Sequence, residues 1–207
     1  MGERHYLPAA GHDWFLPFYD PIVRVFGFRS ALLPLVAQAE LRPSHVVLDV
    51  GCGTGNLAIE IARRFPGIHV TGLDPDSNAL AIARRKAESA GIAIRFDEGF
   101  GDALPYPGAS FDRVFSSMMF HHIPGEDRTK VLSEIRRVLK TGGRLEFLDF
   151  AGGSHNFLAQ LFHSHQQSPA AEDRLLRRMA EAGFTSVRGT GNARTIFGRL
   201  AFYQASS

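Results

Sequence analysis

The sequence predicts an α/β fold in which a sheet of seven strands, mostly parallel, carries helices on both faces. Between residues 46 and 150, short apolar runs alternate with segments of helical periodicity, a pattern typical of parallel strands and crossover helices. The last two apolar runs, 184–188 and 195–203, are joined only by residues 189–194. Because this link is too short for a crossover, we expect the last strand to be antiparallel.

Length and composition favour a single domain over residues 1–207. The chain has 207 residues, of which 44% are hydrophobic, and this suffices for one well-buried core. Aromatic residues and prolines crowd into residues 1–44, where we expect a helical N-terminal segment or lid. A helix is predicted from Ser30 to Leu41, with Pro34 tolerated in its first turn.

The next stretch is predicted to be a buried strand, a glycine turn and the start of a helix. Residues 46–50 form a short apolar run, and apolar side chains then recur on one helical face between Leu57 and Phe65. The glycines of the turn occupy alternate positions, Gly51, Gly53 and Gly55. Without side chains there, the backbone can turn sharply and approach a ligand directly.

The remaining elements follow in the same alternation, so that residues 45–150 form the core of the fold. Further strands are expected at Ile68–Asp74, Ile92–Phe96, Phe111–Ser116 and Arg144–Phe150. Helices are expected from about Asp76 to Ala90, around Val131–Val138 and at Ala171–Ala182. A turn at Lys140–Gly143 closes the second of these helices, a short insert covers 151–170, and the last helix and a hairpin complete 171–207.

Charge and cysteine content exclude several classes of protein. The net charge is +2 with both signs interspersed, which does not indicate nucleic-acid binding. Cys52 is the only cysteine, so an internal disulfide is excluded, and the first residues lack the apolar core of a signal peptide. No run approaches the roughly 18 apolar residues of a membrane span. We therefore expect a cytoplasmic protein without an integral membrane segment, either a monomer or a homodimer.

The spacing within the glycine turn separates two kinds of ligand site. A nicotinamide dinucleotide site requires Gly-x-Gly-x-x-Gly, but Asn56 stands where the third glycine should be, and Asp49 precedes Gly51 by two. In these residues the chain resembles the class I S-adenosylmethionine-dependent methyltransferases, whose first motif is acidic-x-Gly-x-Gly-x-Gly. Over residues 45–203 further segments resemble that family, namely Gly72–Asp76, Leu104–Pro107 with Ser110–Asp112, and Leu139–Gly143.

The resemblance implies a Rossmann-like fold that binds S-adenosylmethionine and releases S-adenosylhomocysteine. It implies donor contacts from the residues Asp49, Gly51, Cys52, Gly53, Gly55, Asn56, Asp74, Pro75 and Ser116. Asp74 would accept hydrogen bonds from the ribose hydroxyls, since a carboxylate has two acceptor oxygens. Asp49 would help to neutralise the amino group of the donor, directly or through water, or else it only holds the turn. Cys52 is expected to be a small residue that fits the turn and not a nucleophile.

One position departs from the family pattern. The family commonly places an Asp in the loop after the third strand to hold the adenine amino group, and Phe100 stands there in this chain. Phe100 cannot accept that bond, so it either packs against adenine, with the Gly101 backbone reading the ring, or belongs to the core. Asp102 is close enough in sequence to be an alternative partner.

Polar residues beyond the fourth and fifth strands are candidates for chemistry on the methyl acceptor, because ligands of open α/β sheets bind at carboxyl strand ends. The chain is similar to quinone-methylase-like members that carry His-His after strand four. This implies that His121 is the base, with Asp149 as its partner or as a group that orients the acceptor. The alternative is that His121 packs or caps the loop, and for His122 we favour that role.

The acceptor itself is the least defined part of the prediction. Tyr19 resembles a tyrosine that closes over the donor in these members, although core packing would also explain it. The insert 151–170 is expected to contribute to the acceptor pocket, and the spacing of His163 and His165 does not favour a metal site. We predict O- or C-methylation of a small, apolar or aromatic molecule. The alternatives are N-methylation of an amine or phospholipid head group, and a non-catalytic S-adenosylmethionine-binding subunit.

Overall fold

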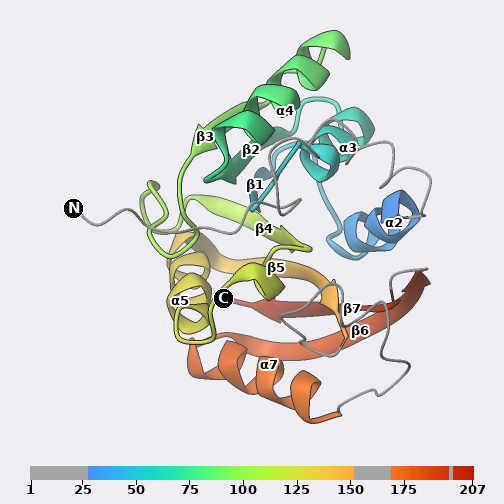
Figure 1. Cartoon of the computed structure of the whole chain (residues 1–207). Helices are drawn as coiled ribbons and strands as arrows, with labels where there is room; N and C mark the ends of the chain where they lie inside the picture. The colour runs from blue at the N-terminus through green and yellow to red at the C-terminus, as the bar shows by residue number, and fades with distance from the viewer. Residues whose placement is uncertain (1–27, 152–168, 196–197) are drawn as a thin grey trace.

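A computed structural model describes residues 28–151, 169–195 and 198–207, which form a single seven-stranded sheet flanked by helices (Figure 1). The strand order is β3-β2-β1-β4-β5-β7-β6. The strands are β1 (Val46–Val50), β2 (His69–Asp74), β3 (Arg95–Glu98), β4 (Phe111–Ser117), β5 (Leu139–Phe150), β6 (Thr185–Thr195) and β7 (Gly198–Ser206). The first five strands run parallel, and β7 is antiparallel to both of its neighbours, as the sequence predicted.

The described helices divide between the two faces of the sheet (Figure 1). They are α2 (Phe28–Gln38), α3 (Asn56–Arg64), α4 (Ser77–Ser89), the short 3₁₀ helix η2 (Phe120–His122), α5 (Arg128–Val138) and α7 (Pro169–Glu181). Side chains of α2, α3 and α4 join one hydrophobic cluster, and those of α5 and α7 join the other. Both faces of the central strands are therefore covered, which explains their continuous apolar runs.

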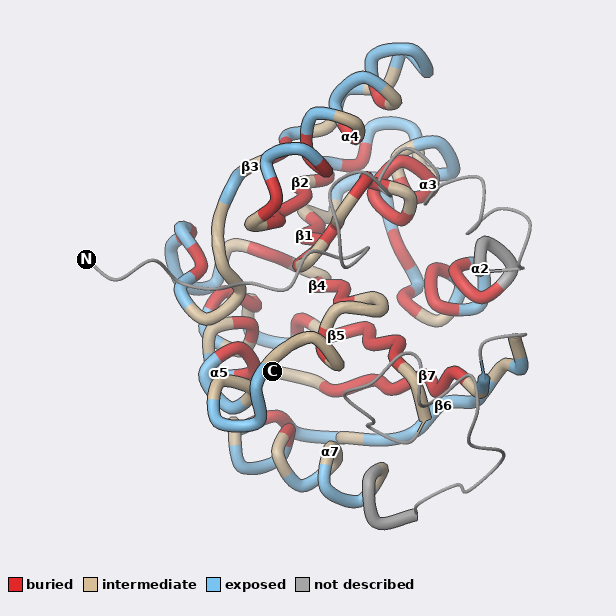
Figure 2. The backbone as a smooth tube through the Cα atoms, viewed as in Figure 1, coloured by how far each residue is buried: buried red, intermediate tan, exposed pale blue. Residues whose placement is uncertain are grey.

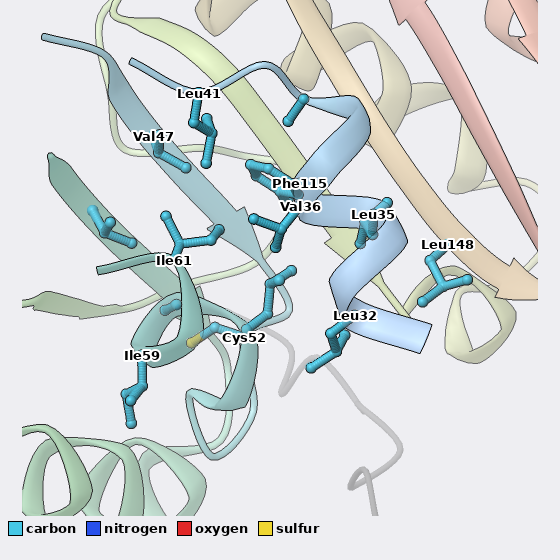
Figure 3. Packing of buried hydrophobic residues seen from close by; sticks show 14 of the residues in the cluster. Leu32, Leu35, Val36, Leu41, Val47, Cys52, Ile59, Ile61, Phe115 and Leu148 are labelled. Carbon is cyan, nitrogen blue, oxygen red and sulfur yellow. The ribbon is translucent and has the colours of Figure 1, made fainter. Parts of the chain in front are cut away.

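Alternation along the strands supplies both clusters. Val47 packs in the α2–α4 cluster and the adjacent Leu48 in the α5–α7 cluster, because successive strand side chains point to opposite faces. Figure 3 shows Leu35 and Val36 of α2 in the same cluster as Phe115 and Leu148 of the sheet. Figure 2 shows the consequence, with buried central strands and exposed outer helix faces, and with the edge strand β6 mostly exposed.

Helix α2 is fixed to the sheet at its C-terminal end. The guanidinium groups of Arg113 and Arg144 donate to the carbonyl of Ala39 at 2.8 and 2.7 Å. The predicted helix at 30–41 is displaced, and Pro34 lies inside α2 and not in its first turn, because the helix already begins at Phe28. Residues 1–27, which include most of the predicted lid, lie outside the described residues.

The start of β3 differs from the prediction for a local reason. The strand expected at Ile92 begins at Arg95, because Gly91 and Ile92 instead end α4 in a Schellman motif. Their backbone N–H groups donate to the carbonyls of Glu88 and Ala87, both at 2.9 Å, and Gly91 has a φ of +66°. Ile92 packs against the α2–α4 cluster as the apolar residue that accompanies this motif.

The hairpin at the end of the chain is also shifted. Residues 189–194, predicted to be the connection, belong to β6, which continues to Thr195. A register shift between Gly189 and Gly191 accommodates the glycines inside the strand as a bulge. In β5, the neighbour of β7, the segment Lys140–Gly143 lies inside the strand, whose pairing with β4 also shifts register there. Among the described helices none has the length and apolar character to cross a membrane.

Candidate active site

The glycine turn between β1 and α3 requires glycine for its backbone conformation. Gly51, Gly53 and Gly55 all have positive φ, at 73°, 52° and 77°. This left-handed region is costly for residues with a Cβ. A Cβ at Gly51 would collide with the side chain of Met119, whereas one at Gly53 would meet nothing within 4 Å. Gly53 is therefore the point at which a ligand can approach the backbone.

Asp74, at the end of β2, is already connected to this turn. Its Oδ2 accepts from the backbone N–H of Gly53 at 2.7 Å, and its Oδ1 accepts from that of Asp76 at 2.9 Å. Burial raises the pKa of Asp74, and these two backbone bonds oppose the rise. Each oxygen keeps a second lone pair, so the side chain can still accept hydrogen bonds from ligand hydroxyls.

Asp49 is a buried carboxylate at the penultimate residue of β1, and it lacks hydrogen-bond partners among the described residues. The residue is 1% exposed, and neither Oδ1 nor Oδ2 accepts a hydrogen bond. Burial, and then the nearby charge of Asp74, raise its pKa to about 7, while the backbone N–H of Ala58, which is nearby but does not meet the geometry of a hydrogen bond, acts in the opposite direction. Buried polar atoms without partners are rare, and they indicate a missing ligand, ion or water. The site suits a positively charged group.

Asn56, predicted to contact the donor, is held by a residue that sequence reasoning missed. Lys86 of α4 donates through Nζ to Asn56 Oδ1 at 2.6 Å and to Thr54 Oγ1 at 3.4 Å. The two residues are 30 positions apart in the sequence, so no local pattern predicts this pair.

The residues predicted to contact adenine follow β3. Phe100 is partly buried, and a Cβ at Gly101 would come within 3.2 Å of Val50, so the loop backbone passes close to the end of β1. Glu134 of α5 holds this loop by accepting from the backbone N–H of Leu104 at 2.9 Å. The role predicted for Phe100, with Gly101 and Asp102 beside it, stays a prediction.

The structure brings His121 and Asp149 into direct contact. Nδ1 of His121 lies 2.7 Å from Asp149 Oδ1, and the backbone N–H of His121 donates to Asp149 Oδ2 at 2.9 Å. The backbone N–H of Phe150 also donates to Oδ1, at 2.7 Å. The contact follows from topology, because β4 and β5 are neighbouring parallel strands whose carboxyl ends meet. An Asp on Nδ1 orients the ring and leaves Nε2 to accept a proton.

His122 has a different environment from its neighbour. Its ring centroid lies 4.0 Å from that of His121. Burial, and secondly the proximity of His121, lower the pKa of His122 to about 4, so it is neutral at physiological pH. A neutral, largely buried ring suits the packing role favoured for it, which remains a prediction.

A cavity of about 100 Å³ lies beside this pair, between η2, β5, β7 and the helices α5 and α7. Its apolar wall includes Phe120 and Phe147, whose rings meet edge to face with centroids 5.2 Å apart. Its polar wall includes His121 and Asp149 together with Arg128 of α5 and residues of α7. A cavity of roughly 150 Å³ holds benzene. This one therefore accommodates a group smaller than an aromatic ring.

Three other predicted positions complete the site. Ser116 is buried, and its hydroxyl makes no hydrogen bond within the described parts of the chain. Cys52 is a buried free thiol, and burial raises its pKa further, which agrees with a packing residue and not a nucleophile. Pro75 lies between Asp74 and the N-cap residue Asp76 of α4. Tyr19 and the insert histidines fall outside the described residues, and those that are described contain no metal-ligating cluster of three or more side chains.

Known proteins with similar sequences share this donor region. The methyltransferase domain family matches residues 47–143. A demethylmenaquinone methyltransferase from Deinococcus radiodurans is 39% identical over 158 residues, which cover 72% of this chain and 64% of the relative. A 27-O-demethylrifamycin SV methyltransferase from Amycolatopsis mediterranei is 38% identical over 118 residues, 56% of this chain and 42% of the relative. The chain thus spans about three-fifths of the length of the curated relatives it matches first.

Solved structures agree on the fold. An S-adenosylmethionine-dependent methyltransferase from Aquifex aeolicus superposes with a TM-score of 0.70 at 17% identity, covering 94% of this chain and 98% of the other. A phosphoethanolamine N-methyltransferase from Haemonchus contortus, solved with S-adenosylhomocysteine, gives a TM-score of 0.76 at 18% identity, covering 95% and 58%. At these identities the likeness shows the arrangement of strands and helices, and not the acceptor.

Proposed function

We propose that this chain, as a member of the class I S-adenosylmethionine-dependent methyltransferases, methylates a small, apolar or aromatic acceptor on oxygen or carbon. The relatives support such an acceptor, because their names specify demethylmenaquinone and a demethylated rifamycin as substrates. The observation that carries the proposal is the His121–Asp149 pair at the carboxyl ends of β4 and β5. An amine acceptor needs little help once it is neutral, whereas a hydroxyl or an acidic carbon must lose a proton as it attacks.

The residues around the glycine turn fit S-adenosylmethionine as the donor. When bound, this donor supplies an electrophilic methyl group on a positively charged sulfur. Asp49 offers two buried oxygens without partners to the amino group of the donor. Gly53 leaves open space for close approach to the backbone, and Asp74 retains lone pairs for the ribose hydroxyls. Because the donor is already activated, the main task of the protein is to align donor and acceptor.

The dyad gives the acceptor side its chemistry. Asp149 is fixed by two backbone N–H groups and holds Nδ1 of His121, so that Nε2 is the nitrogen available to accept a proton from the acceptor. The carboxylate then stabilises the imidazolium that forms. A pair with these partners does more than pack the loop, which favours the base over the capping alternative for His121. A cytoplasmic location, a small-molecule partner in place of nucleic acid, and a monomer or homodimer form part of the same proposal.

Two measurements test this function. Isothermal titration with S-adenosylmethionine should show saturable binding, and absence of binding would overturn the proposal. Mass spectrometry after incubation with a panel of quinols, phenols and amines should then show methyl transfer to hydroxylated aromatic members. Methylation of the amines alone would establish the N-methyltransferase alternative. Donor binding without transfer to any member would favour a non-catalytic binding subunit.

A further inference from the structure

The cavity beside the dyad, called here the α5–α7 cavity, contains charge that the proposed reaction has not yet used. Arg128, Arg174 and Arg178 line it together with Glu172 and Asp149. In the ranges that the structure describes, none of the three arginines forms an ion pair, and neither does Glu172. Three guanidinium groups and two carboxylates surround a space of about 100 Å³, so the cations outnumber the acidic groups of its lining.

Arg128 is the most constrained of these cations. Its Nε donates to the carbonyl of Ile123 at 3.0 Å, and its guanidinium carbon lies 5.4 Å from the centroid of the Phe120 ring. Its Nη2 is sealed from solvent and has no partner among the described residues. A buried donor of this kind indicates a ligand or water that would complete the site.

Arg178 approaches the same cavity from α7. Its Nη1 donates to the carbonyl of Gly125 at 2.7 Å. Burial lowers the pKa of Arg128, the charge of Asp149 opposes this shift, and repulsion from Arg178 is a smaller contribution in the lowering direction. Both guanidinium groups are fixed by carbonyls of the loop at 123–125, directly after η2. A negative charge placed in the cavity beside them would be stabilised by both groups.

We propose that the α5–α7 cavity binds the ionised oxygen of a weakly acidic hydroxyl group, so that the acceptor is a phenol or enol that reacts through its anion. The inference rests on the proposed methyl transfer and names its substrate class. The O–H bond of the acceptor breaks, the proton binds to Nε2 of His121, and the electron pair stays on the oxygen that faces Arg128 and Arg178. Fixed donors aimed at a charge that develops during reaction are an effective form of electrostatic stabilisation.

Two features distinguish this ligand from other anions and from amines. A carboxylate would arrive already ionised and would leave His121 without a proton to accept, whereas the base lines the same cavity as the arginines. An ammonium group would meet like charges. The volume admits only the hydroxyl-bearing edge of an aromatic ring, and the edge-to-face pair of Phe120 and Phe147 forms an apolar wall there.

The test uses 4-nitrophenol, whose anion is coloured, with the full chain saturated with S-adenosylhomocysteine so that no turnover occurs. Absorbance titration gives the pKa of the bound phenol. We expect that pKa to fall by about one unit, which corresponds to tenfold tighter binding of the phenolate than of the phenol. Arg178→Met should abolish this fall in the pKa of bound 4-nitrophenol. Arg177→Met is the matched control and should retain the fall in pKa, because Arg177 is exposed on the same helix and its guanidinium, among the described residues, donates to the Asp173 carbonyl.

Arg128→Met is a second variant, in which the fall in the pKa of bound 4-nitrophenol should be lost. Arg128→Lys conserves the charge and should recover part of that fall. The proposal is overturned if wild-type protein shows no saturable binding or an unshifted pKa, or if Arg178→Met and Arg177→Met behave alike. Tighter binding of benzoate than of 4-nitrophenolate, or equal binding of 4-nitroaniline, would also overturn it. Calorimetry with S-adenosylmethionine distinguishes failure of this inference from failure of the proposed methyl transfer. If donor binding persists while the phenolate test fails, the methyltransferase assignment stands and only the acceptor class is wrong.

Discussion

Replacing the buried carboxylate of Asp49 with an amide should change stability and donor binding in opposite directions. Asp49 is 1% exposed, it accepts no hydrogen bond within the described residues, and its pKa is raised to about 7. An acid whose pKa is raised by folding binds more protons in the native state than in the unfolded state. The native state therefore loses stability as the pH rises from about 4 to about 7, and it loses no more above that range.

The size of the effect follows from this pKa. Between pH 5 and pH 8 the native carboxyl loses its proton while the unfolded one is already ionised, which costs about 3 kcal/mol of unfolding free energy. Asp49→Asn has no such titration. The difference in unfolding free energy between variant and parent should thus move by about 3 kcal/mol in favour of the variant between pH 5 and pH 8. The other acidic groups contribute equally to the pH dependence of both proteins, so their contributions cancel in this difference.

Donor binding should respond in the opposite sense. An amide cannot neutralise the amino group of S-adenosylmethionine, and a hydrogen bond to a charged group contributes roughly 1.5–3 kcal/mol. The Kd for the donor should therefore rise by about 10- to 100-fold at pH 8. The assays are urea unfolding of the donor-free protein at pH 5 and pH 8, and isothermal titration at pH 8. The same stability difference at both pH values would refute the raised pKa. An unchanged Kd would mean that Asp49 only holds the turn.

Three further substitutions test other parts of the site. His121→Ala should lower kcat by about 100- to 10,000-fold while donor Kd, measured by titration, stays unchanged, and unaltered turnover would rule out the base. Gly51→Ala should weaken donor binding at least tenfold, because a φ of +73° strains alanine and its Cβ would collide with Met119. Donor affinity equal to that of the wild type would contradict this. Glu146→Gln should lower the unfolding free energy, measured in urea, by about 1–3 kcal/mol, because the side-chain amides of Gln38 and Gln204 would lose an acceptor oxygen. Stability equal to that of the wild type would show that these amides find other partners.

Periodicity and spacing sufficed for most of the fold and for the position of the glycine turn between β1 and α3. The carboxylates of Asp49 and Asp74 lie at the ends of adjacent strands, and strand ends can be located from apolar runs alone. The predicted start of the third strand was wrong, because an apolar residue such as Ile92 fits both a strand and the end of a helix. Ile92 belongs to a helix terminus and not to a strand, because Gly91 redirects the chain into a Schellman motif that resembles a strand start in sequence.

The acceptor side was less accessible from the sequence because its residues come from distant segments. His121 and Asp149 are 28 residues apart, and their contact required the knowledge that β4 and β5 are neighbours. Arg178 lies 53 residues from the carbonyl of Gly125 that it binds, so its place beside the dyad carries no local signal. In sequence it reads as an ordinary charged residue of an amphipathic helix.

Met119 connects these two halves of the site. Its side chain occupies the space in which a Cβ on Gly51 would lie, and it immediately precedes η2, which carries His121. The preceding Met118 has a positive φ of 57°, and its N–H donates to the Leu148 carbonyl at 2.8 Å, so this strained loop is held against β5. A shift of the turn at Gly51 must move Met119, and through it the segment that places His121 on Asp149. The glycine that the donor motif requires for its backbone is therefore also required by the loop that holds His121 against Asp149.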